Sequence, residues 1–337
     1  MSQYTYLKGI NLGGWLSQYD PGTNVKEHYA AFIVEKDIET IAAWGADHVR
    51  LPFESGVLDD ESFRYMDKCV EWCSKRGMGV LLDLHYVEGM RCDPNARFNP
   101  LFLPENKQRM LDVWESVSRH FAGADDGVRY ELLNEVTDGT GYQWNRLYPE
   151  VVAAIRKREP QRVIYVGSNK MNDVNFLCSL DILDDPKIVY NFHYYEPHPF
   201  THQNAPFDND MKQFAHAYGY PCDFDGLYEY MSAHPYYAKR FPYLPFQRND
   251  LAQIRENFEK AADFVEYTRK PLYCGEFGVI ERADQQAAAA WVRDVITELR
   301  ALGVGYAYWC YKTRDFGLVD EKSRLVMPLL PKVLFGD

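Results

Sequence analysis

The sequence has no apolar run long enough to cross a membrane. A spanning helix needs roughly 18 or more largely uncharged apolar residues, and no stretch of this 337-residue chain approaches that length, although 46% of its residues are hydrophobic. Residues 1–6 also contain neither the basic segment nor the apolar segment of a secretory leader. We therefore expect no membrane association and favour a cytoplasmic location, while a secreted protein whose leader had been removed would show the same start.

Clusters of basic residues are missing as well. The chain carries 37 Lys and Arg against 49 Asp and Glu, a formal net charge of -12, and the acidic residues are scattered along its length. Nucleic-acid binding requires concentrated Lys and Arg side chains that neutralise phosphates. The composition therefore argues against nucleic acid as a partner.

Cysteine is sparse and shows no paired pattern. The seven cysteines are an odd set, and only Cys69 and Cys73 lie close together in sequence, one helical turn apart. This spacing favours the buried face of a helix over a metal or redox pair. We expect a reducing compartment and no metal or other cofactor.

What the sequence does contain is a series of eight short apolar or alternating runs. Most are separated by a segment with helical periodicity, which is the pattern of repeated β-α units. Eight such strands favour a closed (β/α)8 TIM barrel over an open sheet, and a barrel of this length forms one domain, here residues 1–337. The runs are KGINLGG from residue 8, HVRLPF from 48, GVLLDLH from 79, VRYELLNE from 128, RVIYVGS from 162, KIVYNFHYY from 187, PLYCGEFG from 271 and GYAYWCYK from 305.

Two of the intervening segments show a clear helical stripe. Apolar residues recur there at spacings of three and four, as one buried face of a helix requires. The first stripe consists of Phe63, Met66, Cys69, Val70 and Cys73. The second consists of Trp291, Val292, Val295, Ile296, Leu299 and Leu302.

One segment interrupts the rhythm. Residues 197–248 hold 13 aromatic residues and seven prolines and show no clear period. Long insertions of this kind are usually binding loops or lids, and the alternative is a surface subdomain that packs only on itself. Because the insertion follows the carboxyl end of the sixth strand, where barrels build their active sites, we favour an aromatic- and Pro-rich cover over an active-site cleft.

Polar side chains concentrate at the carboxyl ends of the predicted strands. Side chains at these positions point toward the mouth of a barrel. One such carboxylate alone is more often a rim residue or a salt-bridge partner, but two from the fourth and seventh strands lie across the mouth from each other. The set comprises Arg50, His85, Asn134, Glu135, His193, Tyr195, Glu276 and Trp309.

Glu135 and Glu276 support a chemical hypothesis. Glycoside hydrolysis needs two carboxyl groups flanking the scissile bond, about 5–5.5 Å apart in a retaining enzyme. We expect Glu276 to act as nucleophile, kept ionised by Arg50 and Tyr195, and Glu135 to act as general acid/base. We further expect the negative charge of Glu276 to raise the pKa of Glu135, so that Glu135 holds a proton near neutral pH.

The remaining polar residues fit supporting roles. Asn134 can hydrogen-bond a sugar 2-hydroxyl, its alternative being a turn cap at the strand end. Trp309 offers a flat apolar face to a pyranose ring, its alternative being core packing. His85 and His193 can orient the carboxylates or the substrate, although a satisfied buried histidine is the default for each.

Several of these runs resemble glycoside hydrolase family 5, in the family's order and over nearly the whole chain from residue 8 to 312. They are GINLGGW, HVRLPF, LLDLHY, ELLNEV, NFHYY, LYCGEFGV and AYWCYK. Within the family, GGWLSQY, EKDIETIA, FTHQ and YCGEFGVI are most similar to the clostridial endoglucanase C type.

This resemblance implies a retaining (β/α)8 barrel in which all eight residues match recurrent active-site positions, with Glu135 as acid/base and Glu276 as nucleophile. It also implies an endo-acting enzyme on β-1,4-glucan or mixed-linkage β-1,3-1,4-glucan. Two loops depart from the family, VEGMRCDPNARFNP after the third strand and KTRDFGLVD near the end. These departures leave subsite preference and endo or exo action open.

Other functions are kept as alternatives. A β-mannanase, an exo-β-1,3-glucanase or a β-glucosidase would use the same pair of carboxylates. A metal-dependent barrel hydrolase would use His85, His193 and a carboxylate, although neither histidine belongs to a recognised ligand spacing. A carbohydrate-binding protein without catalysis is disfavoured by the presence of both glutamates. The expected partner is a β-glucan polysaccharide or oligosaccharide, and the expected state is a monomer.

Overall fold

The computed structural model describes residues 6–20, 22–91, 98–214, 216, 218–222, 224–242, 244 and 248–336. Cys92 and part of the loop after the third strand lie outside the described residues. Among the described residues, no helix is both long enough and apolar enough to pass through a membrane.

Eight parallel strands close into a barrel in chain order, with β1 hydrogen-bonded to both β2 and β8. The predicted (β/α)8 barrel is therefore confirmed, and each predicted run contains a strand. The strands are β1 (Lys8–Asn11), β2 (His48–Glu54), β3 (Gly79–Tyr86), β4 (Val128–Glu131), β5 (Ile164–Gly167), β6 (Ile188–Tyr194), β7 (Leu272–Phe277) and β8 (Gly305–Tyr308).

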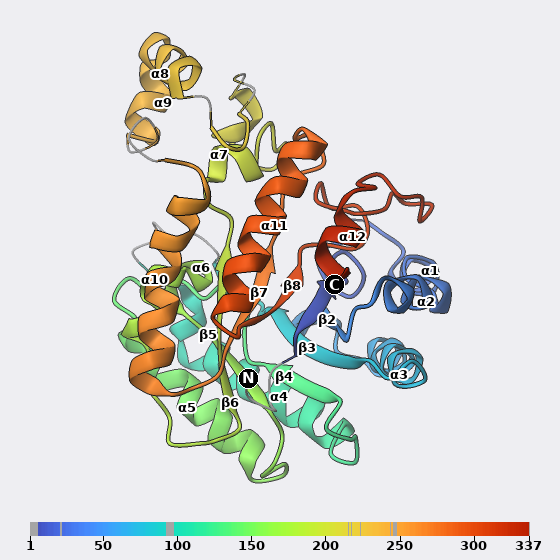
Figure 1. Cartoon of the computed structure of the whole chain (residues 1–337). Coiled ribbons are helices and arrows are strands. Elements are labelled where there is room, and N and C mark those ends of the chain that lie inside the picture. Colours follow the sequence, from blue (N-terminus) through green and yellow to red (C-terminus); the bar gives the residue numbers. More distant parts are fainter. Residues whose placement is uncertain are drawn as a thin grey trace.

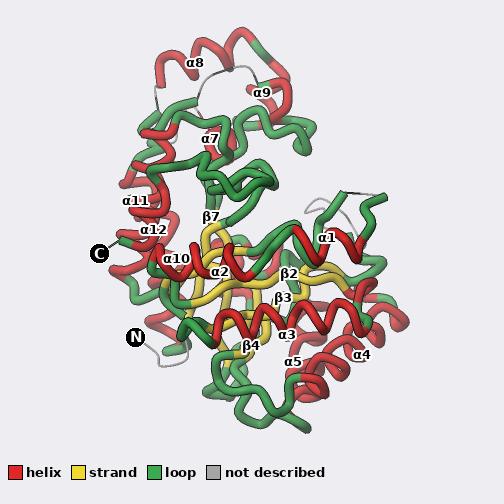
Figure 2. The backbone as a smooth tube through the Cα atoms, turned by 90° about the vertical axis from the view of Figure 1, so that its right-hand side faces the viewer, coloured by secondary structure: helices red, strands yellow, loops and turns green. Residues whose placement is uncertain are grey.

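Helices surround the barrel and run alongside its strands (Figures 1 and 2). After β5 the chain makes only the short α6 (Asn169–Asn172) and a 3-10 turn (Val174–Ser179). The other helices are α1 (Val25–Ala31), α2 (Glu35–Trp44), α3 (Asp60–Ser74), α4 (Pro104–His120), α5 (Tyr142–Arg156), α7 (His198–Thr201), α8 (Phe224–Ala233), α9 (Pro235–Arg240), α10 (Leu251–Thr268), α11 (Gln285–Ala301) and α12 (Leu330–Phe335).

The two helical stripes predicted from the sequence lie on α3 and α11. Met66, Cys69 and Cys73 are fully buried on α3, so the cysteine spacing does mark a buried helix face. On α11, Trp291 and Val295 are fully buried. Burying such an apolar face stabilises the fold by roughly 25 cal/mol for each Å² removed from water, which explains why these segments are helices packed on the barrel.

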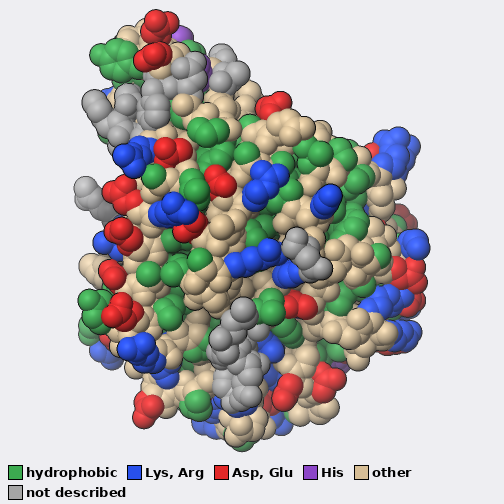
Figure 3. Space-filling view, in the orientation of Figure 1, with side chains coloured by type: hydrophobic (Ala, Val, Ile, Leu, Met, Phe, Trp, Pro, Cys, Tyr) green, Lys and Arg blue, Asp and Glu red, His purple; other side chains and the backbone are tan. Residues whose placement is uncertain are grey.

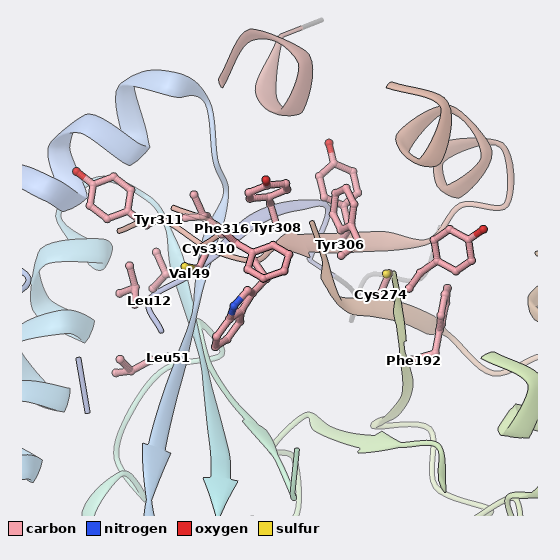
Figure 4. Close-up of a cluster of buried hydrophobic side chains, with 14 of the residues drawn as sticks. Leu12, Val49, Leu51, Phe192, Cys274, Tyr306, Tyr308, Cys310, Tyr311 and Phe316 are labelled. Carbon is pink, nitrogen blue, oxygen red and sulfur yellow. The ribbon is translucent and has the colours of Figure 1, made fainter. Parts of the chain in front are cut away.

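The apolar core lies mainly between the strands and the helix layer. Figure 4 shows part of it, where Phe192 of β6, Cys274 of β7 and Tyr306 and Tyr308 of β8 lie close together. A second, smaller cluster contains Tyr6, Tyr165 and Tyr273, with Leu81, Val163, Val189 and Ala307. Basic and acidic side chains are interspersed over the face drawn in Figure 3.

The insertion between β6 and α10 contains more regular structure than its sequence suggested. Residues 224–240 form α8 and α9, although we found no clear period there. Both helices stand clear of the barrel in Figures 1 and 2. Phe214 packs against Tyr230 and Tyr237 at ring-centroid distances of 5.1 and 4.9 Å, and Leu227 is fully buried. This part of the insertion therefore has a small aromatic core of its own.

Candidate active site

A cleft of about 940 Å³ opens at the carboxyl end of the strands. Its lining comes from loops that follow several different strands, together with the first part of the insertion. Seven of the eight predicted site residues line it, namely His85, Asn134, Glu135, His193, Tyr195, Glu276 and Trp309. The structure thus brings residues from five strand ends to one place.

Arg50, the eighth predicted residue, lies beneath this cleft and is fully buried. It is the third residue of β2, so it lies deeper in the barrel than the strand-end position we expected. Its guanidinium group donates to Glu276 at 2.7 Å, to both oxygens of Glu131 at 2.7 and 2.8 Å, and to Asn134 at 2.9 Å. One buried cation therefore fixes three side chains, two from the end of β4 and one from β7.

Glu276 accepts hydrogen bonds from the two partners that the sequence suggested. Its Oε1 lies 2.7 Å from Arg50, and its Oε2 lies 2.9 Å from the Tyr195 hydroxyl. Only 6% of its side chain is exposed. Arg50 thus supplies a positive charge and Tyr195 a hydrogen-bond donor, and together they hold both oxygens of Glu276 in place.

A β-bulge directs Glu276 into the barrel. In the register between β6 and β7, Phe192 pairs with Cys274, but His193 pairs with Glu276, so Gly275 is the extra residue. A Cβ atom at Gly275 would lie 2.7 Å from the Asn191 side chain, which is too close. Glycine therefore allows both the bulge and the close contact with Asn191.

Glu135 lies four residues beyond the end of β4, in the loop and not on the strand. Its backbone φ is +44°, in the left-handed region that non-glycine residues seldom adopt. Such strain persists only where the surrounding structure holds it, and it often occurs at functional sites. About a fifth of the Glu135 side chain reaches solvent, in contrast to the almost buried Glu276.

Burial raises the pKa of Glu135 to about 7. His85 and Arg50 oppose this rise, and the charge of Glu131 adds to it. We expected the pKa to be raised by the charge of Glu276, and this cause was wrong. The largest contribution is desolvation, and the carboxylate that adds to the rise is Glu131. A pKa of about 7 leaves much of Glu135 protonated at neutral pH, as a general acid requires.

The two predicted histidines are both buried and have different partners. His193 directs Nδ1 toward Glu135 at 3.1 Å and toward Glu276 at 3.7 Å. His85 bonds Asp83 through Nδ1 at 2.7 Å. Burial lowers the pKa of His193 to about 4 and also lowers the pKa of His85. Both rings are therefore neutral near pH 7.

Asn134 and Trp309 border the same space. The Asn134 side chain accepts from Arg50 at 2.9 Å and lies 3.4 Å from Nε2 of His85, so it is not a turn cap. The Trp309 ring stacks on His85 with an interplanar angle of 12° and is 6% exposed. A Cβ atom at Gly13 would lie 2.6 Å from this ring, so glycine leaves room for it.

Three buried groups near the site were missed from the sequence. Asp83 lies between Arg50 at 3.0 Å and His85, and burial raises its pKa to about 7. Glu131 binds Arg50 and Asn191, and Asn172 lies 3.1 Å from His193. Charged residues inside otherwise apolar strands were the available signal for Asp83 and Glu131, since a buried charge requires a partner.

Glu135, His193 and Glu276 each place one ligand-type atom within 4.8 Å of the others. The metal hypothesis had combined His85 with His193, but His85 is turned toward Asp83. The only carboxylate pair in this group is Glu135 and Glu276. Two carboxylates this close, on a cleft with an aromatic wall, fit the hydrolysis of a glycosidic bond.

The comparison with protein families agrees with this geometry. Residues 19–315 match the family described as cellulase (glycosyl hydrolase family 5). The chain belongs to glycosyl hydrolase family 5. As a family 5 member it is a glycoside hydrolase, and the resemblance noted in its sequence is confirmed.

Similar proteins of known name cover most or nearly all of the chain. Endoglucanase C of Acetivibrio thermocellus is 36% identical over 340 residues, which cover 98% of this chain and 98% of that protein. Cellodextrinase A of Ruminococcus flavefaciens is 32% identical over 85% of this chain and 80% of its own length. A solved hyperthermophilic endo-β-1,4-glucanase, in complex with substrate, shares the fold with a TM-score of 0.78 and 23% identity, covering 98% of this chain and 97% of that one.

Proposed function

We propose that this chain is a retaining endo-β-glucanase that cleaves β-1,4-glucan or mixed-linkage β-1,3-1,4-glucan. The observation that carries the proposal is the approach of Glu135 and Glu276, whose carboxylate oxygens lie within 4.8 Å in one cleft. Retaining glycosidases hold their carboxyl groups about 5–5.5 Å apart, whereas inverting enzymes need about 6.5–9.5 Å for an intervening water. The full-length relative named as an endoglucanase supports the substrate class and the endo mode.

In the first step, Glu276 attacks the anomeric carbon and forms a covalent glycosyl ester. The bond from that carbon to the leaving oxygen breaks, and Glu135 gives its proton to this oxygen. Arg50 and Tyr195 each donate to one oxygen of Glu276 and so hold the carboxyl group in place before the attack. Asn134, held by Arg50, is positioned for the sugar 2-hydroxyl, and Trp309 supplies an apolar wall for the ring.

In the second step, water attacks the same carbon and releases Glu276. Glu135, now ionised, takes a proton from this water and returns to its starting state. The reaction consumes one water for each bond cleaved and keeps the anomeric configuration. Glu276 thus forms and then releases a bond to the sugar, and Glu135 gives and then takes a proton. Both side chains must therefore face the same sugar.

Substitution of each glutamate tests the roles separately. Glu276→Ala and Glu135→Ala should each lower kcat on barley β-glucan and carboxymethylcellulose by about 10⁴-fold or more, because neither step proceeds without its partner. Added azide should restore Glu276→Ala with an α-glycosyl azide as product, since azide enters from the vacated nucleophile side. On an aryl β-cellobioside, whose leaving group needs no proton, azide should restore Glu135→Ala with a β-glycosyl azide as product. Near-normal turnover by either variant without azide contradicts the assignment.

We also propose that the first part of the insertion (197–210) forms one wall of the substrate cleft. His198, His202 and Phe207 lie among the residues that line it. The Phe207 ring is 59% exposed and lies 6.4 Å from Phe316, whose ring lies 5.9 Å from Tyr195. A line of rings therefore leads from the Glu276 contact to Phe207, where a glucosyl unit away from the scissile bond can stack.

Phe207→Ala tests this wall. We expect kcat/KM on cellohexaose to fall about 10-fold, equivalent to about 1.4 kcal/mol, while hydrolysis of an aryl β-cellobioside stays within about twofold. Tyr228→Ala is the matched control, because Tyr228 is a 60% exposed ring of the same insertion outside the cleft lining. Equal loss on both substrates, or an equal effect of Tyr228→Ala, contradicts the proposed wall.

The products distinguish the neighbouring activities of the family. An endo-glucanase lowers the viscosity of barley β-glucan long before much reducing sugar appears, whereas an exo-β-1,3-glucanase or a β-glucosidase releases glucose from the start. A β-mannanase would prefer galactomannan over β-glucan. Activity that survives a strong chelator removes the metal-dependent alternative.

A further inference from the structure

The turn that follows β5 has a backbone that side chains rarely adopt. Lys170, Met171 and Asn172 have φ values of 57°, 64° and 55°, three left-handed residues in succession. None of them is glycine, and L-residues visit this region as isolated exceptions. The surrounding structure must therefore hold the turn in place.

Hydrogen bonds tie this turn to the segment that carries Glu135. The Met171 amide donates to the carbonyl of Val136 at 3.1 Å, and the Asp138 amide donates to the Asn169 side chain at 2.8 Å. On the other side, Asp173 forms an isolated bridge with His193. The turn thus links the Glu135 loop to β6.

The Asn172 side chain contacts His193 at Nε2, the ring nitrogen that does not face the two glutamates. It is fully buried, and its Nδ2 lies 3.1 Å from Nε2 of His193. Its Oδ1 has no hydrogen-bond partner among the described residues. A Cβ atom at Gly167 would lie 2.4 Å from this oxygen, so glycine at that position makes room for the amide. The buried amide is therefore committed to one contact, the one with the histidine.

Burial keeps the His193 ring neutral, so the ring carries one N–H proton, on either Nδ1 or Nε2. Nε2 faces the Asn172 amide, while Nδ1 faces Glu135 at 3.1 Å and Glu276 at 3.7 Å. A neutral imidazole donates from one nitrogen and accepts at the other, and the partner of one nitrogen decides the state of its neighbour.

We propose that Asn172 is a positioning residue for hydrolysis, which donates to Nε2 of His193 and so fixes the ring proton on Nδ1, between Glu135 and Glu276. From there the N–H donates to Glu135 when that carboxylate is ionised between the two steps, and it orients the carboxylate toward the incoming water. No proton leaves the ring in this role. The inference rests on the proposed function, since it concerns the same carboxylate pair.

Replacement of Asn172 by glycine distinguishes a role of the side chain from a role of the left-handed backbone conformation. Glycine adopts a φ of 55° without strain, so a residue retained only for its backbone would be replaced without loss. We expect Asn172→Gly to lower kcat/KM about 10-fold or more, the scale on which outer hydrogen bonds to oriented histidines act, with an unchanged or raised Tm. Arg269→Gly is the control, because Arg269 is also left-handed, with φ of 58°, but it is exposed at the end of α10 and lies outside the cleft lining. It should keep full activity.

The ring proton itself can be observed. In ¹⁵N NMR spectra of the full chain, His193 should show protonated Nδ1 and unprotonated Nε2, and Asn172→Gly should lose this preference. Asn172→Asp keeps the shape of the side chain but accepts where the amide donates, so it should move the proton to Nε2 and lower activity, even if the glycine variant folds poorly.

Full activity of Asn172→Gly, or an Nδ1-protonated His193 in Asn172→Asp, overturns the inference. These outcomes leave the proposed function untouched as long as Glu276→Ala is inactive. Conversely, an active Glu276→Ala removes the proposed function whatever Asn172 does.

Discussion

The barrel mouth and the distal half of the insertion (211–244) are built from different interactions. At the mouth, Arg50 joins Glu131, Asp83 and Glu276 in a buried network in which nearly every polar atom has a defined partner. In the distal insertion, Phe214 and Tyr237 pack ring edge to ring face. Charges with directional bonds hold one geometry, whereas apolar contacts tolerate rearrangement. The rigid network therefore lies beside the proposed catalytic glutamates, whereas the more adaptable packing lies away from them.

The largest expected effect comes from removing the cation of the mouth. Arg50→Met leaves three buried carboxylates without their partner, so we expect a loss of about 3–5 kcal/mol in the free energy of unfolding. We also expect kcat to fall at least about 100-fold, because Glu276 loses its 2.7 Å donor. Urea unfolding and steady-state kinetics measure the two effects.

Arg255→Met is the control for this change. Arg255 pairs with Glu298 at 3.0 Å, but its side chain is 60% exposed. Exposed pairs contribute at most about 1 kcal/mol. A comparable loss of stability in both variants would contradict a special contribution of the buried Arg50 network.

A pH profile makes a smaller but more specific test of the mouth. Because the Glu135 pKa is about 7, and because only the protonated form can donate, kcat/KM should fall about 10-fold for each pH unit above that value. Glu135→Gln should abolish this alkaline limb. Asp83, whose pKa is also about 7, provides the control: Asp83→Asn should leave the limb in place. A limb that moves with Asp83 and not with Glu135 contradicts the assignment of the acid.

The smallest effect on activity is expected in the distal insertion. Phe214→Ala removes the central ring of its core, and such a change costs about 3–5 kcal/mol locally. We expect faster proteolysis within residues 224–240, an unchanged barrel transition, and activity on an aryl β-cellobioside within about twofold of normal. Loss of that activity would show that the two regions are energetically coupled.

The strand pattern of the fold was predictable because each strand is an apolar run beside a helix with one buried face. The eight runs gave the barrel, and the stripe ending at Cys73 gave α3. α8 and α9 were not predicted, because their aromatic residues contact one another within a small separate core and leave rings such as Tyr228 exposed. A short helix of this kind has no single apolar stripe to detect.

The site was predictable where a polar residue follows a strand. Asn172 was missed because it lies in a turn, between Met171 and Asp173, where no sequence pattern distinguishes it. The cause of the Glu135 pKa was missed for another reason: the number of atoms that cover a side chain depends on tertiary packing. Sequence identifies which groups titrate, whereas packing decides how far their pKa values shift.

The bulge at Gly275 determines what kind of mutation could relocate Glu276. Side chains alternate between the two faces of a strand, so a one-residue slip reverses the direction of everything beyond it. From Tyr273, which faces the barrel interior, regular alternation would turn Glu276 outward and Phe277 inward. No substitution at position 276 alters this direction, but a substitution at Gly275 that removed the bulge, with the number of residues unchanged, would turn the carboxylate toward the helix layer. For the proposed nucleophile, the β-bulge at Gly275 therefore matters as much as the glutamate itself.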